Sequence, residues 1–253
     1  MIRQFTLASV IASMLAASAE AETFAYGRFG EVTVYRPSTT PIALAVFLSG
    51  DGGWNLGVVS MAQNIANQGA LVLGVNYVTL GGALDAITET SCNDGASEIQ
   101  TLADSARAKL NLPAGLPVVL IGYSSGATAV YLVQAQAMKG AFAGSIALGF
   151  CPDLWGKKPF CAGRSKELIP KTNREGFVYP PVSGGMPGFI ALQGMQDQIC
   201  EPHATIDFIG KVPGARIVML AKVGHGFGVE RNWMPQFLEA YHSLIARKES
   251  TLP

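Results

Sequence analysis

The stretch Leu120-Ile121-Gly122-Tyr123-Ser124-Ser125-Gly126 decides the expected fold of this chain. It joins an apolar run to a serine flanked by glycines, and a helix-like run follows directly. A buried strand, a sharp turn with a serine at its tip and then a helix make up a nucleophile elbow. Gly122 and Gly126 leave room where side chains would clash in such a turn. The stretch predicts that Ser124 stands exposed above a sheet, although a glycine-rich turn with a surface serine fits these residues as well.

The composition indicates one compact domain. The chain has 253 residues, of which 49% are hydrophobic and 14% charged, and single α/β domains often reach about 250 residues. Its 18 basic and 18 acidic residues give a formal net charge of zero, so nothing indicates a nucleic-acid partner. We expect residues 22–253 to form a single domain.

The first residues have the pattern of a targeting segment. Arg3 precedes a small, apolar run over 5–18, and Ala19-Glu20-Ala21 is a cleavage site of the A-x-A type. The sequence therefore predicts a signal peptide over residues 1–21 and export, most simply to a bacterial periplasm. An uncleaved anchor is the alternative, but the apolar run is shorter than the about 20 residues that a spanning helix needs.

The four cysteines favour disulfides over a metal site. An even number in an exported chain is typical of disulfide bonding. Their spacings match no zinc pattern, and the histidines do not cluster with them. Four cysteines allow three pairings, of which we favour Cys151–Cys161 and Cys92–Cys200. No metal and no cofactor are expected.

Apolar runs alternate with helical spacings along the rest of the chain. Strands are expected at 31–35, 42–48, 70–77, 117–121, 144–150, 188–192 and 216–220, and helices at 55–67, 96–110, 127–137, 203–210 and 232–247. This alternation predicts the α/β class, with a mostly parallel, doubly wound sheet. The segment over 79–94 shows no regular pattern and is expected to be irregular.

The segment over 151–187 is rich in proline and glycine and has no clear period. It is too long for a plain loop in a compact domain, so we expect a lid-like insertion. Its basic residues outnumber its acids Asp153, Glu167 and Glu175; they are Lys157, Lys158, Arg164, Lys166, Lys171 and Arg174. A solvated face and an anion-facing surface are both open interpretations of this excess.

Asp197 and His225 follow the last two expected strands. A serine hydroxyl needs a base to take its proton, and the base needs an acid that holds its tautomer. The α/β-hydrolase order is Ser, then Asp or Glu, then His. We therefore expect Ser124, Asp197 and His225 to converge at the carboxyl edge of the sheet. Asp153 is the competing acid, and a structural loop histidine is the alternative for His225.

An oxyanion would need two backbone N–H donors. Ser125 offers one, directly after the serine at the elbow. Asp51 or Gly52 offers the other from the glycine-rich turn after the strand at 42–48. This turn lacks the lysine of a phosphate-binding P-loop. We also predict that Trp54 and Tyr123, which adjoin these two motifs, contact substrate.

Three motifs together resemble the VirJ/AcvB family of exported bacterial α/β hydrolases. They are Leu48-Ser49-Gly50-Asp51-Gly52-Gly53-Trp54, Gly122-Tyr123-Ser124-Ser125-Gly126 and Gly224-His225-Gly226-Phe227. The first is the most specific, since many hydrolases share the second. The resemblance covers nearly the whole expected mature chain and fits the short, one-domain VirJ form or the catalytic C-terminal half of AcvB.

The resemblance implies a periplasmic serine esterase that hydrolyses the aminoacyl ester of aminoacyl-phosphatidylglycerol, such as the lysyl ester. It makes Ser124 the nucleophile, Asp197 the acid and His225 the base. It also implies peripheral contact with the inner membrane and a link to virulence and type IV secretion proteins. Asp51 and Asp94 are candidates to bind the substrate's amino group.

One departure from the family concerns substrate choice. An aromatic-rich segment is expected after the strand that ends near Tyr77, but residues 79–94 are small and polar here and include Cys92. A generic short-chain carboxylesterase therefore remains an alternative. A non-catalytic secretion adaptor on a hydrolase scaffold is another, because fold does not fix function. The complete Ser, Asp and His set favours an enzyme.

Overall fold

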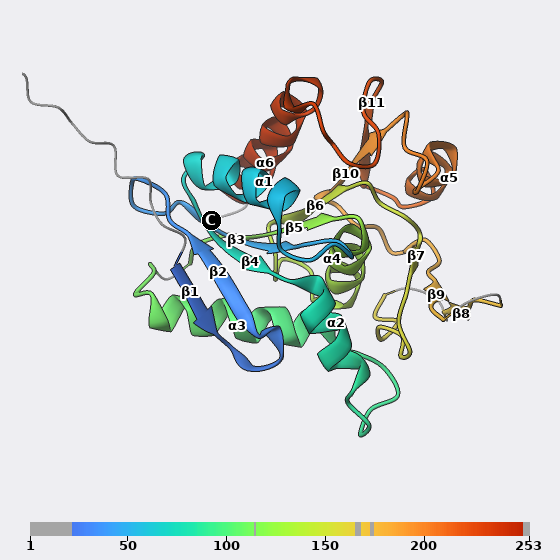
Figure 1. Cartoon of the computed structure of the whole chain (residues 1–253), viewed down its shortest axis with the longest axis horizontal. Helices are drawn as coiled ribbons and strands as arrows, with labels where there is room; N and C mark the ends of the chain where they lie inside the picture. The colour runs from blue at the N-terminus through green and yellow to red at the C-terminus, as the bar shows by residue number, and fades with distance from the viewer. Residues whose placement is uncertain (1–21, 114, 165–167, 173–174, 250–253) are drawn as a thin grey trace, which may run out of the picture.

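An eight-stranded sheet runs through the molecule in the order β1-β2-β4-β3-β5-β6-β10-β11 (Figure 1). The strands from β4 to β11 in this order are parallel, and β1 and β2 extend one edge in antiparallel orientation. The strands are β1 (Glu22–Ala25), β2 (Glu31–Tyr35), β3 (Ala43–Leu48), β4 (Ala70–Val75), β5 (Val118–Tyr123), β6 (Gly144–Leu148), β10 (Phe189–Gly194) and β11 (Arg216–Leu220). This computed structural model describes residues 22–113, 115–164, 168–172 and 175–249, so the expected signal peptide over 1–21 lies outside the described residues.

Helices cover both faces of this sheet (Figure 1). They are α1 (Leu56–Asn67), α2 (Tyr77–Asp85), α3 (Gly95–Lys109), α4 (Ser125–Gln136), α5 (Pro202–Ile209) and α6 (Met234–Glu249), with short 3-10 helices η1 (Gly27–Phe29) and η2 (Glu230–Asn232). In β3, Ala45 and Phe47 pack in the core layer of α1 and α6, whereas Val46 and Leu48 pack in the layer of α3 and α4. Successive side chains of a strand point to opposite faces, so the parallel strands are apolar throughout because both faces are buried.

The structure confirms the expected mostly parallel sheet with helices on both faces. Each strand and helix expected from the sequence is present, with ends shifted by a residue or two. The elbow strand β5 and helix α4 lie in the centre of the sheet, where β5 pairs with β3 and β6. This central place brings the glycine-rich turn after β3 next to the serine turn after β5.

The expectation of an irregular segment over 79–94 is wrong in its first part, because α2 occupies Tyr77–Asp85. Asn76 caps this helix by accepting a hydrogen bond from the Val78 N–H at 3.0 Å. Its buried residues Tyr77, Leu80 and Leu84 recur at helical spacing. Two glycines and a threonine dilute this apolar stripe, so the spacing was hard to recognise in the sequence.

The insertion over 151–187 contains a small antiparallel sheet of its own. Its strands are β7 (Asp153–Leu154), β8 (Ile169–Pro170) and β9 (Phe177–Val178), in the order β7-β9-β8. The small sheet stands to one side of the main sheet, near the end of α4 (Figure 1). Its role as a lid stays a prediction.

Several basic side chains of the insertion are engaged within the protein. The Arg164 guanidinium donates to the carbonyl groups of Gln134, Ala135 and Gly185. Lys171 forms an ion pair with Asp153. Lys166 and Arg174 lie outside the described residues. Arg164 and Lys171 thus bind within the fold, which makes them poor candidates for an anion-facing surface.

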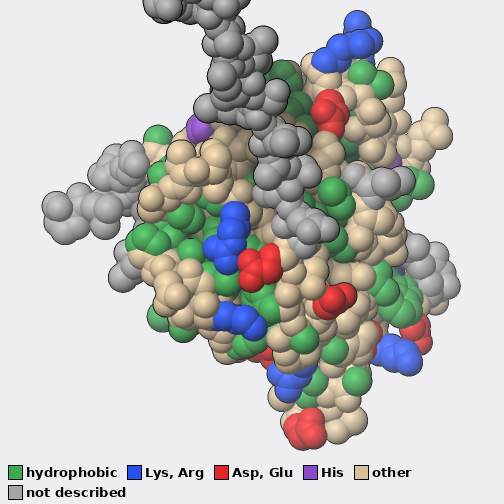
Figure 2. All heavy atoms as spheres, turned by 60° about the vertical axis from the view of Figure 1, so that its left-hand side comes forward, with side chains coloured by type: hydrophobic (Ala, Val, Ile, Leu, Met, Phe, Trp, Pro, Cys, Tyr) green, Lys and Arg blue, Asp and Glu red, His purple; other side chains and the backbone are tan. Residues whose placement is uncertain are grey.

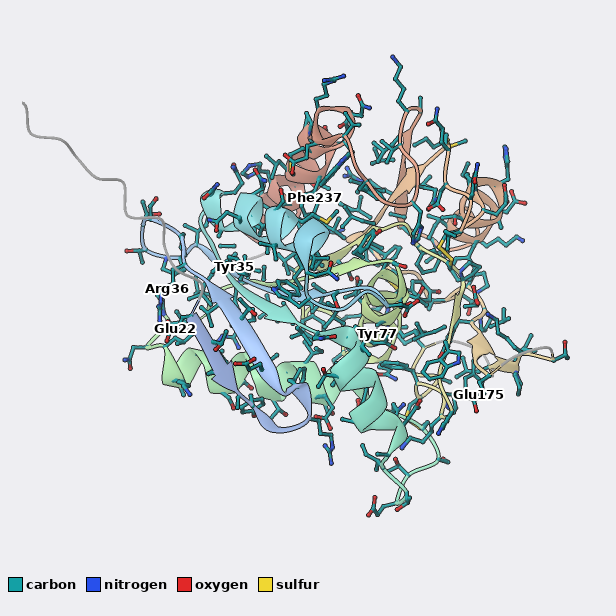
Figure 3. All side chains as sticks on the ribbon, viewed as in Figure 1. Glu22, Tyr35, Arg36, Tyr77, Glu175 and Phe237 are labelled. Carbon is teal, nitrogen blue, oxygen red and sulfur yellow. A yellow bond between two sulfur atoms is a disulfide. The ribbon has the colours of Figure 1, made fainter. Side chains whose placement is uncertain are left out.

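The favoured disulfide pairing is wrong. The bonds are Cys92–Cys161 and Cys151–Cys200, with Cα–Cα distances of 4.9 and 5.0 Å, and every cysteine is paired (sulfur is yellow in Figure 3). Cys151 follows β6 and Cys200 follows β10, and these two strands are neighbours in the sheet. Cys92 and Cys161 meet because the adjoining residues Asn93 and Phe160 form a β-bridge. Two disulfides fit an exported protein.

The surface carries charges of both signs. Figure 2 shows positive and negative side chains scattered among polar and apolar ones on one face, in keeping with a net charge of zero. Across the described residues, no helix combines the length and the hydrophobicity needed to cross a membrane.

Candidate active site

Ser124 occupies the sharp turn between β5 and α4. Its φ of +55° lies in a region that residues other than glycine rarely adopt, and its N–H donates to the Leu148 carbonyl at 2.9 Å. A Cβ at Gly122 would lie 2.1 Å from the Gly126 oxygen, and one at Gly126 would lie 2.3 Å from the Leu48 oxygen. The Gly-x-Ser-x-Gly pattern is therefore required by backbone packing at this turn.

The three side chains expected to converge form one hydrogen-bonded chain. The His225 Nε2 lies 2.9 Å from the Ser124 Oγ, and the His225 Nδ1 lies 2.9 Å from the Asp197 Oδ2. The Asp197 side chain is fully buried, whereas that of His225 is 18% exposed. The competing acid Asp153 is paired with Lys171 in the insertion instead. The structure thus places Asp197, and not Asp153, on the histidine.

The carboxylate of Asp197 is held from both sides. Its Oδ1 accepts hydrogen bonds from the N–H groups of Ile199 at 2.8 Å and Cys200 at 2.9 Å. Its Oδ2 accepts from the Gln193 Nε2 at 3.2 Å as well as facing His225. Cys200 is tied to Cys151. These contacts fix the carboxylate plane and so fix the face that it presents to the imidazole.

Gln193 is a site residue that the sequence reasoning missed. It is fully buried in β10, and its Nε2 also lies 3.0 Å from the Cys200 carbonyl oxygen and 3.4 Å from that of Gly194. Three acceptors around one nitrogen identify that atom as the donor. The available signal was a glutamine inside an otherwise apolar strand, because a buried amide needs partners.

Tyr123 supports the histidine loop. Its hydroxyl donates to the His225 carbonyl at 3.0 Å, and the two rings lie 5.7 Å apart. Burial, followed by the charge of Asp197, raises the pKa of the Tyr123 hydroxyl, so this hydroxyl keeps its proton and can donate. The predicted contact between Tyr123 and substrate stays a prediction beside this structural role.

Trp54 packs behind the glycine-rich turn. Its Nε1 donates to the Tyr35 hydroxyl at 3.2 Å, and its ring stands edge-on to Phe47. A Cβ at Gly74 would lie 2.1 Å from the Trp54 ring, so the indole covers the backbone of β4. These contacts place Trp54 against the core layer of α1 and α6, while its predicted contact with substrate stays a prediction.

The backbone N–H groups expected to stabilise an oxyanion are free of hydrogen bonds to other groups in the described part of the chain. The N–H groups of Asp51, Gly52 and Ser125 donate to no other described residue. The Ser125 hydroxyl donates to the Asp51 Oδ1 at 2.6 Å, which links the turn after β3 to the start of α4. A Cβ at Gly50 would lie 2.9 Å from the Ser124 Cβ. Two turns with free N–H groups therefore adjoin the serine, as stabilisation of an oxyanion requires.

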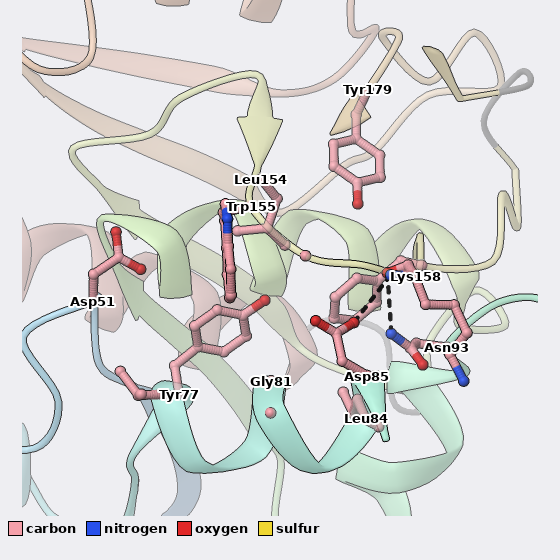
Figure 4. Close-up of a pocket in the computed structure, with 14 residues that line it drawn as sticks. Asp51, Tyr77, Gly81, Leu84, Asp85, Asn93, Leu154, Trp155, Lys158 and Tyr179 are labelled. Carbon is pink, nitrogen blue, oxygen red and sulfur yellow. Dashed lines mark hydrogen bonds between the residues drawn. The ribbon is translucent and has the colours of Figure 1, made fainter. Parts of the chain in front are cut away.

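A cavity of about 260 Å³ lies between α2 and the insertion and reaches Asp51 in the turn after β3 (Figure 4). Asp51 lies at one end and Asn93 at the other. Its walls are mostly apolar or aromatic, and its lining comprises Asp51, Tyr77, Val78, Gly81, Gly82, Leu84, Asp85, Asn93, Leu154, Trp155, Gly156, Lys158, Phe160 and Tyr179. Of the two acids expected to bind an amino group, Asp51 lines this cavity. Asp94 instead caps α3 through the Ser97 N–H at 3.1 Å.

Some polar groups of the cavity have hydrogen-bond partners within the protein, and others have none. The Asp85 carboxylate accepts from the backbone N–H groups of Lys157 at 2.9 Å and Lys158 at 3.1 Å. The Asn93 Nδ2 donates to the Lys158 carbonyl at 3.3 Å, while the Asn93 Oδ1 is buried without a hydrogen-bond partner. Burial first, and then nearby Tyr179 and acids, raises the pKa of the Tyr77 hydroxyl. The cavity therefore combines apolar walls with unused acceptor capacity.

One group of side chains resembles a metal site in its spacing alone. Potential ligand atoms of Asp197, Cys200 and His225 come within 4.8 Å of one another. The Cys200 sulfur is bonded to Cys151, however, and is not available as a thiolate. The donors left are the hydrogen-bonded Asp197 and His225, which do not make up a metal-binding set of their own.

Solved structures with the same architecture define the class of fold. The esterase domain of a Rhodothermus marinus protein superposes with a TM-score of 0.55 and 17% identity, covering 90% of this chain and 98% of that one. Est1E from Butyrivibrio proteoclasticus gives 0.58 and 14%, covering 89% and 99%. XC6422 from Xanthomonas campestris, described as an α/β serine hydrolase without lid, gives 0.51 and 18%, covering 92% and 95%. The chain therefore has the α/β-hydrolase fold.

Part of the sequence matches the model of a known protein family. The model of the family described as "Bacterial virulence protein (VirJ)" matches residues 42–139. These residues include the turn after β3 and the elbow around Ser124, whereas Asp197 and His225 lie beyond them. The match confirms the resemblance to VirJ over this part of the chain. No curated protein matches the chain by sequence.

Proposed function

We propose that this protein is a serine esterase. The observation that carries the proposal is the hydrogen-bonded chain from Ser124 through His225 to Asp197 on an α/β-hydrolase fold. In this arrangement a base is in contact with the hydroxyl that it must deprotonate, and a carboxylate holds the base. A binding scaffold would have no need of that alignment.

The proposed reaction proceeds through an acyl-enzyme. The Ser124 Oγ attacks the ester carbonyl carbon while its proton passes to the His225 Nε2. The N–H of Ser125, with that of Asp51 or Gly52, stabilises the negative charge that develops on the carbonyl oxygen. His225 then protonates the leaving alcohol oxygen as the carbon–oxygen bond breaks. Water, deprotonated by His225, attacks the acyl-enzyme and releases the acid and free Ser124.

The proposed substrate is aminoacyl-phosphatidylglycerol, for example its lysyl ester. The VirJ match supports this choice. The cavity supports it as well, because about 260 Å³ is smaller than the about 300–1,000 Å³ of typical ligand pockets. Such a cavity holds one small acyl group, while a phospholipid leaving group stays outside. Asp51, at one end of the cavity, is a suitable partner for the amino group of an aminoacyl ester.

The proposed location is the periplasm, with the substrate at the outer face of the inner membrane. The two disulfides support an oxidising compartment, and the expected signal peptide over 1–21 supports export. Peripheral contact with the membrane and with secretion-system proteins is part of the same proposal.

The decisive experiment offers two substrates to the purified mature protein. Lysyl-phosphatidylglycerol in mixed micelles is compared with a soluble short-chain ester, and a fluorophosphonate probe reports labelling of Ser124. Release of lysine that is lost in Ser124→Ala is the expected result. Cleavage of the soluble ester without release of lysine would replace this substrate by that of a generic carboxylesterase. Absence of labelling and of both hydrolyses would favour the secretion adaptor.

A further inference from the structure

We propose that the cavity between α2 and the insertion is a subsite for a protonated amine at the end of the acyl group's side chain. In this subsite Asp85 is the residue that selects for the positive charge. The inference rests on the proposed esterase function, but it concerns which acyl groups the site prefers. Asp85 lies on the segment that the sequence analysis expected to be irregular, so no motif pointed to it.

Three side chains along the cavity carry carboxylate or amide oxygens that can accept hydrogen bonds. Asp51 and Asp85 contribute carboxylates, and Asn93 contributes an Oδ1 that has no partner although the residue is only 3% exposed. The amide orientation of Asn93 is fixed, because its Nδ2 donates to the Lys158 carbonyl. An unpaired buried acceptor is costly. A ligand that brings donors would satisfy it.

Lys158, the basic residue in the cavity lining, forms no ion pair with Asp51 or Asp85. The Lys158 ammonium donates to the Ile87 carbonyl at 2.8 Å and to the Thr90 hydroxyl at 3.2 Å. Figure 4 shows its side chain leading away from Asp51 and Tyr77. What Asp85 receives from Lys158 is a backbone N–H at 3.1 Å, and not the ammonium. The carboxylate charge of Asp85 thus remains for a ligand.

Asp85 retains the capacity to bind an ammonium group. Each of its oxygens accepts one backbone N–H, from Lys157 or Lys158, and a carboxylate has about four acceptor positions in total. The two N–H bonds also hold the carboxylate in a fixed orientation. A charge-assisted hydrogen bond to such a preoriented group is stronger than one between neutral groups.

The walls fit the rest of a long, cationic side chain. Leu84, Leu154 and Phe160 are buried and apolar, so they suit a chain of methylene groups. The rings of Tyr77 and Tyr179 face the same space as Asp85 (Figure 4), and aromatic faces attract cations. The Tyr77 hydroxyl makes no hydrogen bond with any described residue and is a further partner for the ligand's N–H groups.

The cavity runs from a point close to the proposed nucleophile to this subsite. Asp51, at its near end, touches Ser125 directly beside the nucleophile, and Asp85 and Asn93 lie towards the far end (Figure 4). An acyl group bound at Ser124 would therefore extend its side chain past Tyr77 towards Asp85. The geometry favours lysyl-like groups over uncharged groups of the same length.

The test compares esters of lysine and norleucine, which differ by the terminal ammonium group. We expect the wild-type protein to hydrolyse the lysine ester with a higher kcat/KM, by about tenfold or more for one charge-assisted hydrogen bond. Asp85→Asn should bring the ratio of the two kcat/KM values close to one, because it lowers kcat/KM for the lysine ester and leaves that for the norleucine ester unchanged. Tyr77→Phe should lower the ratio less. Glu89→Gln, a charge removal on the same segment outside the cavity lining, should leave it unchanged.

Equal rates for the two esters in the wild type, or an unchanged ratio in a folded Asp85→Asn protein, would overturn the subsite while leaving the esterase intact. Thermal unfolding checks folding. If neither ester is hydrolysed, the aminoacyl part of the proposed function fails, and ligand protection decides the subsite. Lysinamide should then slow fluorophosphonate labelling of Ser124 more than norleucinamide does, and Asp85→Asn should abolish that difference. Equal protection by both amides would refute the subsite.

Discussion

The two ends of the site are built in different ways. At the Ser124 end, His225 and Asp197 lie beyond the ends of sheet strands, and both carboxylate oxygens of Asp197 are engaged. At the cavity end, α2 and the insertion form the walls, and Asn93 leaves an acceptor unpaired. The turns and loops at the ends of the sheet strands thus carry the proposed chemistry, and α2 with the insertion carries the proposed selection. A fold shared with other hydrolases can differ in specificity at this second end.

The largest expected effect separates two adjacent serines. Ser124→Ala removes the proposed nucleophile and should lower kcat by about 10⁵- to 10⁶-fold. Ser125→Ala removes the hydroxyl that donates to Asp51 but keeps the backbone N–H, so a change of less than about tenfold is expected. Ester hydrolysis by both variants, with circular dichroism as the folding control, makes the measurement. Near-normal activity of Ser124→Ala would show that Ser124 is not the nucleophile.

The second effect concerns the acid. Asp197→Asn should lower kcat by about 10⁴-fold, because an amide would hold His225 in the wrong tautomer. Asp153→Asn weakens the ion pair with Lys171 in the insertion and should change kcat little. Steady-state kinetics with a soluble ester tests both variants. A severe loss in Asp153→Asn with a mild one in Asp197→Asn would exchange their roles.

The two disulfides offer a matched pair of perturbations, one at each end of the site. They close segments of 49 and 69 residues, so loop entropy predicts a similar loss of about 4 kcal/mol in unfolding free energy for removal of either. Cys151→Ala with Cys200→Ala should lower kcat, because Cys200 holds Asp197. Cys92→Ala with Cys161→Ala should alter mainly the lysine-to-norleucine ratio, because this bond adjoins Asn93.

Urea unfolding gives the free energies, and kinetics with both esters gives the activities. Identical activity patterns in the two double variants would contradict the division of the site into two ends.

The smallest expected effect tests the support that Tyr123 gives to the His225 loop. Tyr123→Phe deletes the hydroxyl that donates to the His225 carbonyl at 3.0 Å and keeps the ring contact. One neutral hydrogen bond contributes about 0.5–1.5 kcal/mol, so kcat should fall by a few fold to about tenfold, with the ester ratio unchanged. A shift in that ratio would instead make Tyr123 a substrate contact.

The sequence predicted the parts of the molecule whose causes are local. The parallel strands were readable as apolar runs because both of their faces are buried. The elbow was readable because backbone packing at Gly122 and Gly126 excludes every side chain. The order of Ser124, Asp197 and His225 followed from the fact that parallel strands end at one edge.

The cysteine pairing and the cavity depended on strand order, which is not local. Cys151 pairs with Cys200 because β6 and β10 are neighbours although they are far apart in the sequence. Asp85 faces the cavity because two N–H groups of the insertion bind its carboxylate. Gln193 acts on Asp197 across a turn of four residues. None of these contacts leaves a periodic pattern in the chain.

The rim of the cavity also gives the protein an optical property. Of the three tryptophans, Trp155 lines the cavity and is 59% exposed, whereas Trp233 is 1% exposed and Trp54 is packed against Phe47. Trp155 therefore supplies the long-wavelength part of the emission and the part that dissolved acrylamide quenches. A molecule that enters the cavity covers this indole and shifts its emission to the blue. Occupancy of the cavity can thus be followed by the intrinsic tryptophan fluorescence of the unlabelled protein, without any turnover of substrate.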